Sequence, residues 1–198
     1  MSAASTDNLA PTQPPSTGLD QVQFAIPIPS DARRTLARGW LWLGLLAPIG
    51  SGVFSVLLVL ARTPGINRLL PGTDFFRVAL VVHVDLSVLV WFISIAGLLW
   101  SINSSRAGLL WGWASLALAG SGTFIMSIAA FVAPGEAIMA NYIPMLDSKV
   151  FVAGLLIFAM GATVLVLRSL LGAPKVGPLT DGTSAMRFGM SASAVATA

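Results

Sequence analysis

One apolar stretch, residues 75–100, limits most strongly what this chain can fold into. Its only ionisable residues are Arg77, His83 and Asp85, and His83 is the only histidine in the 198-residue sequence. About 20 residues of α-helix cross the hydrocarbon core of a bilayer, so this stretch predicts a transmembrane helix. Ionisable groups inside a membrane are costly and usually functional. We therefore treat His83 and Asp85 as candidate functional residues.

Three further apolar runs, at about 39–60, 108–132 and 150–171, are also long enough to predict transmembrane helices. The sequence is 56% hydrophobic and only 10% charged, whereas a soluble domain carries about 25% charged residues. The predicted fold class is all-α: a polytopic membrane protein with four transmembrane helices. The lipid bilayer is therefore an expected partner.

Three regions are expected along the chain. Residues 1–32 are rich in Pro, Ser, Thr and Ala and predict a disordered cytoplasmic tail rather than a signal peptide. Residues 33–172 form the four-helix transmembrane domain. Residues 173–198 contain a linker and, from Arg187, an apolar segment typical of the start of a fifth helix that stops early. We expect the chain to be a truncated or divided piece of a longer parent.

Basic residues predict the orientation of the spans. Seven fall on one side of the predicted membrane and four on the other. The larger set is Arg33, Arg34, Arg38, Arg106, Arg168, Lys175 and Arg187, and the smaller is Arg62, Arg68, Arg77 and Lys149. The positive-inside rule then puts both termini in the cytoplasm of a bacterial-type inner (plasma) membrane. His83 would lie about seven residues, or roughly 10 Å, from the outer end of its helix.

Composition excludes several kinds of site. The sequence has no cysteine, which excludes disulfides, thiolate metal sites, Cys-ligated iron–sulfur clusters and haem attached through C-x-x-C-H. A net charge of +3 is too small to suggest a nucleic-acid partner. No catalytic triad or Gly-rich phosphate loop is present.

His83 and Asp85 are expected to point to opposite sides of their helix, because two residues correspond to about 200° of rotation. The residues that share the His83 face are Leu86, Ser87, Val90 and Trp91. The helix would then be enclosed on both sides, which implies an assembly larger than four helices.

Three roles are open for His83: ligation of haem iron, proton relay, or a hydrogen bond to a neighbouring helix. A six-coordinate low-spin haem needs two axial ligands, so a second histidine ligand would come from another chain. Asp85 is a candidate for a proton path, and a carboxylate bonded to a neighbouring helix or to water is an equal alternative.

Other residues are expected to have structural roles in helix packing, at the membrane interface or in a loop. Ser115, Ala119, Thr123 and Ser127 form a stripe of small residues that would let a neighbouring helix approach closely. Trp40 and Trp42 fit interfacial anchors, as do Asn141 and Tyr142. Glu136 and Asp147 are expected to be solvated in an outer loop.

Two motifs carry a resemblance to a known family. They are Phe75-Phe-Arg-x5-His83-Val-Asp-Leu-x-Val-Leu-Val-Trp91-Phe, and Asn141-Tyr-Ile-Pro-Met-Leu-Asp147 before the fourth span. From about Ala37 to Leu171 the chain resembles the N-terminal portion of haem–copper oxidase (cytochrome c oxidase) subunit I, closest to the cbb3-type and nitric-oxide-reductase branches. Val84 departs from the aa3-type pattern, in which a glycine commonly follows the histidine.

The resemblance implies that His83 is an axial ligand of the low-spin haem, of unknown type, in electron transfer toward oxygen reduction. It implies that the second ligand, the high-spin haem ligand and the copper histidines lie on later helices, so this chain would bind no copper and would not be catalytically complete alone. Its partners would be the remaining subunit I helices or a companion chain, together with other oxidase subunits.

Two other functions stay open. One is a small, non-catalytic four-helix accessory or assembly protein, in which His83 and Asp85 only bond between helices. The other, a proton-coupled transporter, is weaker because internal repeats and paired broken helices are missing.

Overall fold

Four long helices dominate the structure, a computed structural model that describes residues 26–70, 74–140, 143–177 and 182–198. Within those ranges, four helices are long and apolar enough to cross a bilayer, at Ala32–Ala61, Phe75–Asn103, Leu109–Val132 and Lys149–Leu171. A helix satisfies its backbone groups internally, as hydrocarbon requires. The all-α, four-span prediction is confirmed. The predicted disordered tail falls largely on residues 1–25, outside the described residues.

The second span is a composite helix. It consists of α2 (Phe75–Val84), the π-helical segment η2 (Asp85–Val90) and α3 (Trp91–Asn103). The other spans are single helices, α1 (Ala32–Ala61), α4 (Leu109–Val132) and α5 (Lys149–Leu171). The switch from α to π geometry begins two residues after His83.

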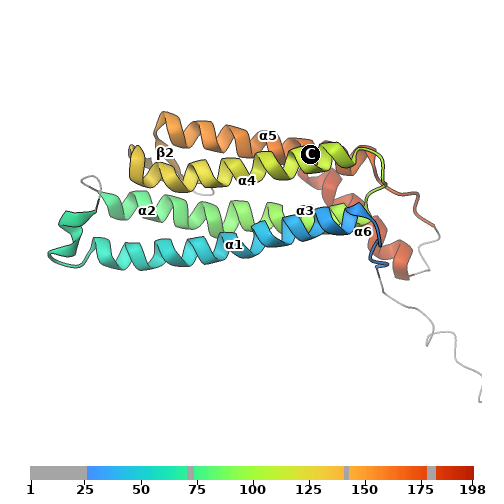
Figure 1. The fold of residues 1–198 in the computed structure, drawn as a ribbon, viewed down its shortest axis with the longest axis horizontal. Helices are drawn as coiled ribbons and strands as arrows, with labels where there is room; N and C mark the ends of the chain where they lie inside the picture. The colour runs from blue at the N-terminus through green and yellow to red at the C-terminus, as the bar shows by residue number, and fades with distance from the viewer. Residues whose placement is uncertain (1–25, 71–73, 141–142, 178–181) are drawn as a thin grey trace, which may run out of the picture.

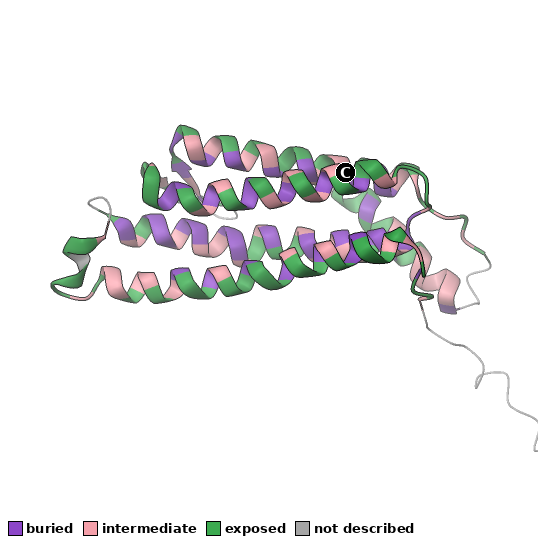
Figure 2. Ribbon diagram, viewed as in Figure 1, coloured by how far each residue is buried: buried purple, intermediate pink, exposed green. Residues whose placement is uncertain are grey.

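The spans form two antiparallel pairs that lie side by side (Figure 1). α1 packs along the whole second span, α4 packs along α5, and the second span also contacts both α4 and α5. Buried residues lie on the facing sides of the helices and exposed residues on the outward sides (Figure 2). The second span is the most buried of the four, so it forms the centre of the bundle.

The two ends of the bundle differ in charge. α1 and α4 begin, and α3 and α5 end, at the same end, where α6 (Gly182–Thr197) also lies (Figure 1). The short helix η1 (Ile66–Leu69) and the loop between α4 and α5 lie at the opposite end. The seven basic residues of the larger set therefore gather at one end of the bundle, which agrees with their placement on one side of the predicted membrane.

The α4–α5 contact depends on small residues, which include Ser115 and Ala119 of the predicted stripe; its other two members, Thr123 and Ser127, line a groove against α1. Ser115 Oγ donates a hydrogen bond of 2.7 Å to the Gly161 carbonyl oxygen across the contact. A Cβ at Gly122 would lie 2.5 Å from the Phe158 backbone nitrogen. The two helices can approach closely here because Gly122 and Gly161 have no side chain and that of Ser115 is small.

Trp40 and Trp42 have different environments. Trp42 is 64% exposed, as an interfacial anchor would be, but Trp40 is fully buried. A Cβ at Gly97 would meet the Trp40 ring at 2.4 Å. The anchor prediction is wrong for Trp40, because its ring packs flat against a glycine of α3.

The connection between α4 and α5 contains a short hairpin that the sequence did not predict. β1 (Glu136–Ile138) pairs antiparallel with β2 (Met145–Asp147), with Glu136 opposite Asp147. Both carboxylates are exposed, as expected for solvated loop residues. Residues 141–142, the proposed interfacial Asn and Tyr, lie outside the described residues.

The apolar segment that begins near Arg187 is helical and belongs to α6, which has 16 residues. α6 packs against α3 and α5. Trp100 Nε1 donates to Ser193 Oγ at 3.0 Å, and Asn103 Nδ2 donates to Ser191 Oγ at 3.3 Å. These bonds tie α6 to the end of the second span.

Asp31 joins α1 to the α3–α4 turn. Its carboxylate caps α1 by accepting from the Arg33 backbone N–H at 2.9 Å, and it pairs with the Arg33 and Arg106 side chains at 2.9 and 2.8 Å. These hydrogen bonds, with those from Arg33 the strongest, hold the pKa of the Asp31 carboxyl well below its usual range. The cluster lies just outside the apolar spans.

Candidate functional site

Ser51 on α1 and His83 on α2 contact each other through three polar contacts. His83 Nδ1 lies 2.8 Å from Ser51 Oγ and 2.9 Å from the Ser51 carbonyl oxygen. Ser51 Oγ lies 3.0 Å from the His83 carbonyl oxygen. A carbonyl oxygen can only accept. One set of donor roles satisfies all three contacts: His83 Nδ1–H donates to Ser51, and the Ser51 hydroxyl donates to the His83 carbonyl.

This arrangement leaves the second ring nitrogen of His83 as the free one. Nε2 makes no hydrogen bond to any residue in the described ranges, and His83 is half-buried. With the proton on Nδ1, Nε2 carries the lone pair. Metal-ligating histidines typically have this form, in which the other ring N–H donates to a backbone carbonyl that fixes the tautomer and the ring orientation.

The backbone of His83 is also held. Its carbonyl oxygen accepts from Ser87 Oγ at 2.8 Å in addition to Ser51 Oγ. The π-helical segment Asp85–Val90 starts immediately beyond, and π-segments inside α-helices are frequent at functional sites. The Ser51 and Ser87 hydroxyl groups thus donate hydrogen bonds to the His83 carbonyl at the point where the helix changes from α to π geometry.

Asp85 lies in a different environment from His83. It is 1% exposed, and both carboxylate oxygens are buried without a hydrogen-bond partner among the described residues. No hydrogen bond or ion pair joins Asp85 to His83 in that part of the chain. The four helices thus enclose the Asp85 side of the second span, while His83 stays half-buried on the side of α1.

The donor set at His83 restricts which cofactor could bind. Among the described residues, no three His, Cys, Asp or Glu side chains gather where they could hold a metal ion. A metal at His83 would take its other ligands from a cofactor or from another chain. Haem fits this requirement because the porphyrin supplies the equatorial ligands and the protein supplies only axial ones. The Nε2 of His83, which makes no hydrogen bond to a described residue, would be the ligand that this chain supplies to such a group.

Ser51 is a candidate-site residue that the sequence did not identify. It stands between Gly50 and Gly52, a run of small residues inside the apolar first span. Small residues let backbones approach closely, so this run was the available signal of a close contact. Its partner, 32 positions away, could not be identified without knowing which face of α1 meets α2.

Known proteins that match this chain are uncharacterised. An uncharacterised protein of Rickettsia prowazekii (strain Madrid E) is 31% identical over a region covering 67% of this chain and 30% of the relative. An uncharacterised protein of Aquifex aeolicus (strain VF5) is 32% identical over 66% of this chain and 33% of the relative. No family model matches the chain, and no solved structure matches it. The chain is therefore similar to a segment of longer proteins, spanning about a third of the length of these two relatives.

Proposed function

We propose that this chain is the N-terminal segment of a haem–copper terminal oxidase catalytic subunit and that His83 is an axial ligand of its low-spin haem. The observation that carries the proposal is the Nδ1 contact of 2.9 Å to the Ser51 carbonyl, which leaves Nε2 as the ligating nitrogen. Such a haem accepts and passes on single electrons when bound. Ser51 sets the orientation and the tautomer of the ring, and Ser87 holds the backbone that carries it.

The remainder of the site lies on other helices. A second axial ligand, a high-spin haem ligand and copper ligands would come from a following segment or a companion chain. Relatives about three times as long as the region they share with this chain support such a division. Further oxidase subunits and the lipid bilayer would be the other partners.

We place the protein in a bacterial-type inner membrane with both termini in the cytoplasm. This orientation is supported by the larger basic set, which lies at the end of the bundle where α1 begins (Figure 1). His83 is then nearer the outer surface. Asp85, buried without a partner on the opposite side of the span, is the candidate carrier for protons.

Optical spectra test the assignment. The chain is co-expressed with any companion chain encoded downstream, and reduced-minus-oxidised spectra are recorded for wild type and for His83→Ala. We expect the low-spin haem absorption to disappear in His83→Ala and to remain in Asp85→Asn, which alters the same helix but keeps the ligand. Unchanged absorption in His83→Ala would overturn the assignment. A colourless wild-type complex would favour the accessory-protein alternative.

A further inference from the structure

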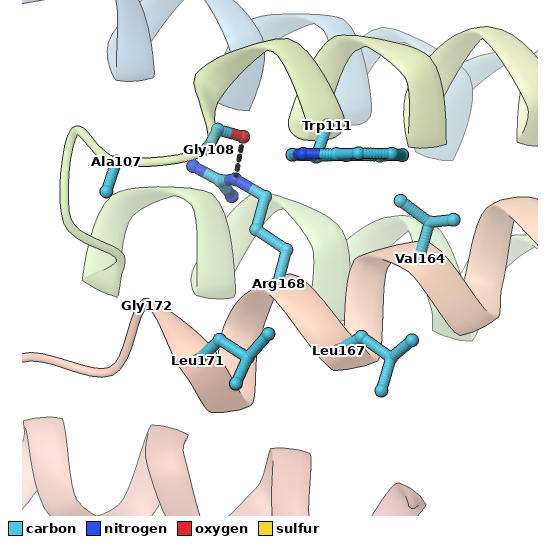
Figure 3. A pocket seen from close by; sticks show the side chains of 8 residues that line it. All are labelled: Ala107, Gly108, Trp111, Val164, Leu167, Arg168, Leu171 and Gly172. Carbon is cyan, nitrogen blue, oxygen red and sulfur yellow. Dashed lines mark hydrogen bonds between the residues drawn. The ribbon is translucent and has the colours of Figure 1, made fainter.

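A groove of about 320 Å³ lies between the start of α4 and the end of α5 (Figure 3). Most of its lining is apolar and includes Trp111, Leu167 and Leu171, and Arg168 is its one charged lining residue. Trp111, Leu167 and Leu171 are all more than half exposed. The groove therefore opens on the outer surface of the α4–α5 pair, at the end of the spans where a bilayer meets its headgroups.

Arg168 is a buried cation in this groove, and no carboxylate of the described residues pairs with it. The residue is only 5% exposed. Its Nε donates to the Gly108 carbonyl at 3.1 Å, and its NH2 nitrogen donates to Ser104 Oγ at 2.7 Å. Its NH1 nitrogen is buried without a partner among the described residues. A buried charge without a counter-ion is costly, and the carboxylate of Asp31 is already engaged by Arg33 and Arg106.

The start of α4 adds to this positive potential. The N-cap residue is Gly108, at φ 70°, and it has no side chain to accept from the first-turn N–H groups. The first turn of α4 also contains no acidic residue. Helix N-termini favour negative charge. Figure 3 shows the Arg168 side chain extending from α5 toward this helix start, beside Trp111.

We propose that the groove is a binding site for an anionic phospholipid. The lipid phosphate supplies the missing negative charge beside Arg168 and the α4 N-terminus, and an acyl chain lies over Trp111, Leu167 and Leu171. Basic pockets between transmembrane helices on the cytoplasmic side are a recognised way to bind anionic headgroups. A lipid fits better than free phosphate because most of the groove wall is apolar. The site does not depend on haem binding.

Lipid titration of the purified full chain in neutral detergent, read by native mass spectrometry, tests the site. The probes are phosphatidylglycerol and phosphatidylcholine. We expect wild type to bind phosphatidylglycerol about fivefold to tenfold more tightly, the preference that one cation can supply. Arg168→Gln should lose that preference. Arg106→Gln, which removes the same charge from an exposed side chain at the same end, should keep it.

A second pair of variants tests the groove itself without touching Arg168. Leu167→Trp should fill the groove and weaken phosphatidylglycerol binding at least threefold, by analogy with overpacking of a cavity. Leu156→Trp, at another exposed position on α5, should leave binding unchanged. This pair decides the question if circular dichroism shows that Arg168→Gln does not fold.

Four results would overturn the proposal. Equal binding of the two lipids by wild type would remove the role of charge. Equal losses in Arg106→Gln and Arg168→Gln, or in both tryptophan variants, would show that the effect does not belong to this groove. Competition by glycerol phosphate as strong as by the lipid would assign the site to a free phosphate.

Discussion

Ser51 and His83 bond to each other in both directions: the Ser51 carbonyl lies 2.9 Å from His83 Nδ1, and the Ser51 hydroxyl lies 3.0 Å from the His83 carbonyl. The two residues stand 32 positions apart, on α1 and α2. The contact fixes both the ring and the backbone of the only histidine in the chain. The proposed haem chemistry depends on this pair.

Removing the Ser51 hydroxyl should weaken the site without abolishing it. In Ser51→Ala the carbonyl contact to Nδ1 remains, and the His83 carbonyl loses one of its two hydroxyl donors. We expect a loss of about 1 kcal/mol in unfolding free energy, the value of one hydrogen bond. Low-spin haem should be retained with a shifted midpoint potential, because outer-shell bonds tune the metal.

Ser121→Ala is the matched control for that measurement. Ser121 is exposed, and its hydroxyl donates within its own helix, to the Leu118 carbonyl. It should change neither the potential nor the stability. Identical potentials for wild type and Ser51→Ala would show that Ser51 does not tune a haem at His83.

The α4–α5 contact should not tolerate a single methyl group. A Cβ at Gly122 would lie 2.5 Å from the Phe158 backbone nitrogen, which cannot move without moving α5. We expect Gly122→Ala to destabilise the protein by roughly 1–3 kcal/mol, the usual range for overpacking. Thermal unfolding in detergent, followed by circular dichroism, measures this.

Gly120→Ala provides the comparison on the same helix. A Cβ at Gly120 would meet nothing within 4 Å. Alanine also has the higher helix propensity, so this variant should be neutral or slightly stabilising. Equal destabilisation by the two substitutions would contradict the close α4–α5 packing.

Stability should fall in acid because of Asp31. Its carboxyl has a lower pKa in the folded protein than in the unfolded chain, because Arg33 and Arg106 donate to it. The stabilisation is therefore fully present above the unfolded value, about 3.9, and is lost as pH falls below it. Unfolding temperatures measured between pH 6 and pH 3 should fall less in Asp31→Asn than in wild type.

Asparagine is a suitable replacement at this position because it also caps helices. The variant then removes the charge and keeps the cap. Asp147→Asn, at the opposite end of the bundle, leaves Asp31 intact and should show the wild-type fall. A fall as steep in Asp31→Asn as in wild type would show that other groups control the acid transition.

The four spans could be predicted because each needs only length and continuous apolarity, both visible in one dimension. Contacts between residues of different helices could not be predicted in this way. Trp40 and Trp42 look equivalent in the sequence, and only the position of Gly97 on α3 distinguishes the buried ring from the exposed one. The strands at Glu136–Ile138 and Met145–Asp147 are too short for an alternating pattern to be recognised.

The same limit applies to the candidate site. His83 and Asp85 could be selected because an ionisable residue is rare in an apolar run, whatever its neighbours are. Ser51 and the groove at Arg168 depend on which helix faces meet. The sequence marks Arg168 only as one of several basic residues near span ends, and its burial beside Gly108 is a property of the α4–α5 packing.

The identity of the axial ligands tests the central claim most directly. Near-infrared magnetic circular dichroism of the oxidised complex, purified with its companion chain, reports the ligand pair of a low-spin haem. We predict a low-spin signal with histidine as one axial ligand in wild type, and a changed ligand signal or loss of the low-spin haem in His83→Met. A wild-type signal that stays unchanged in His83→Met would show that another residue binds the haem.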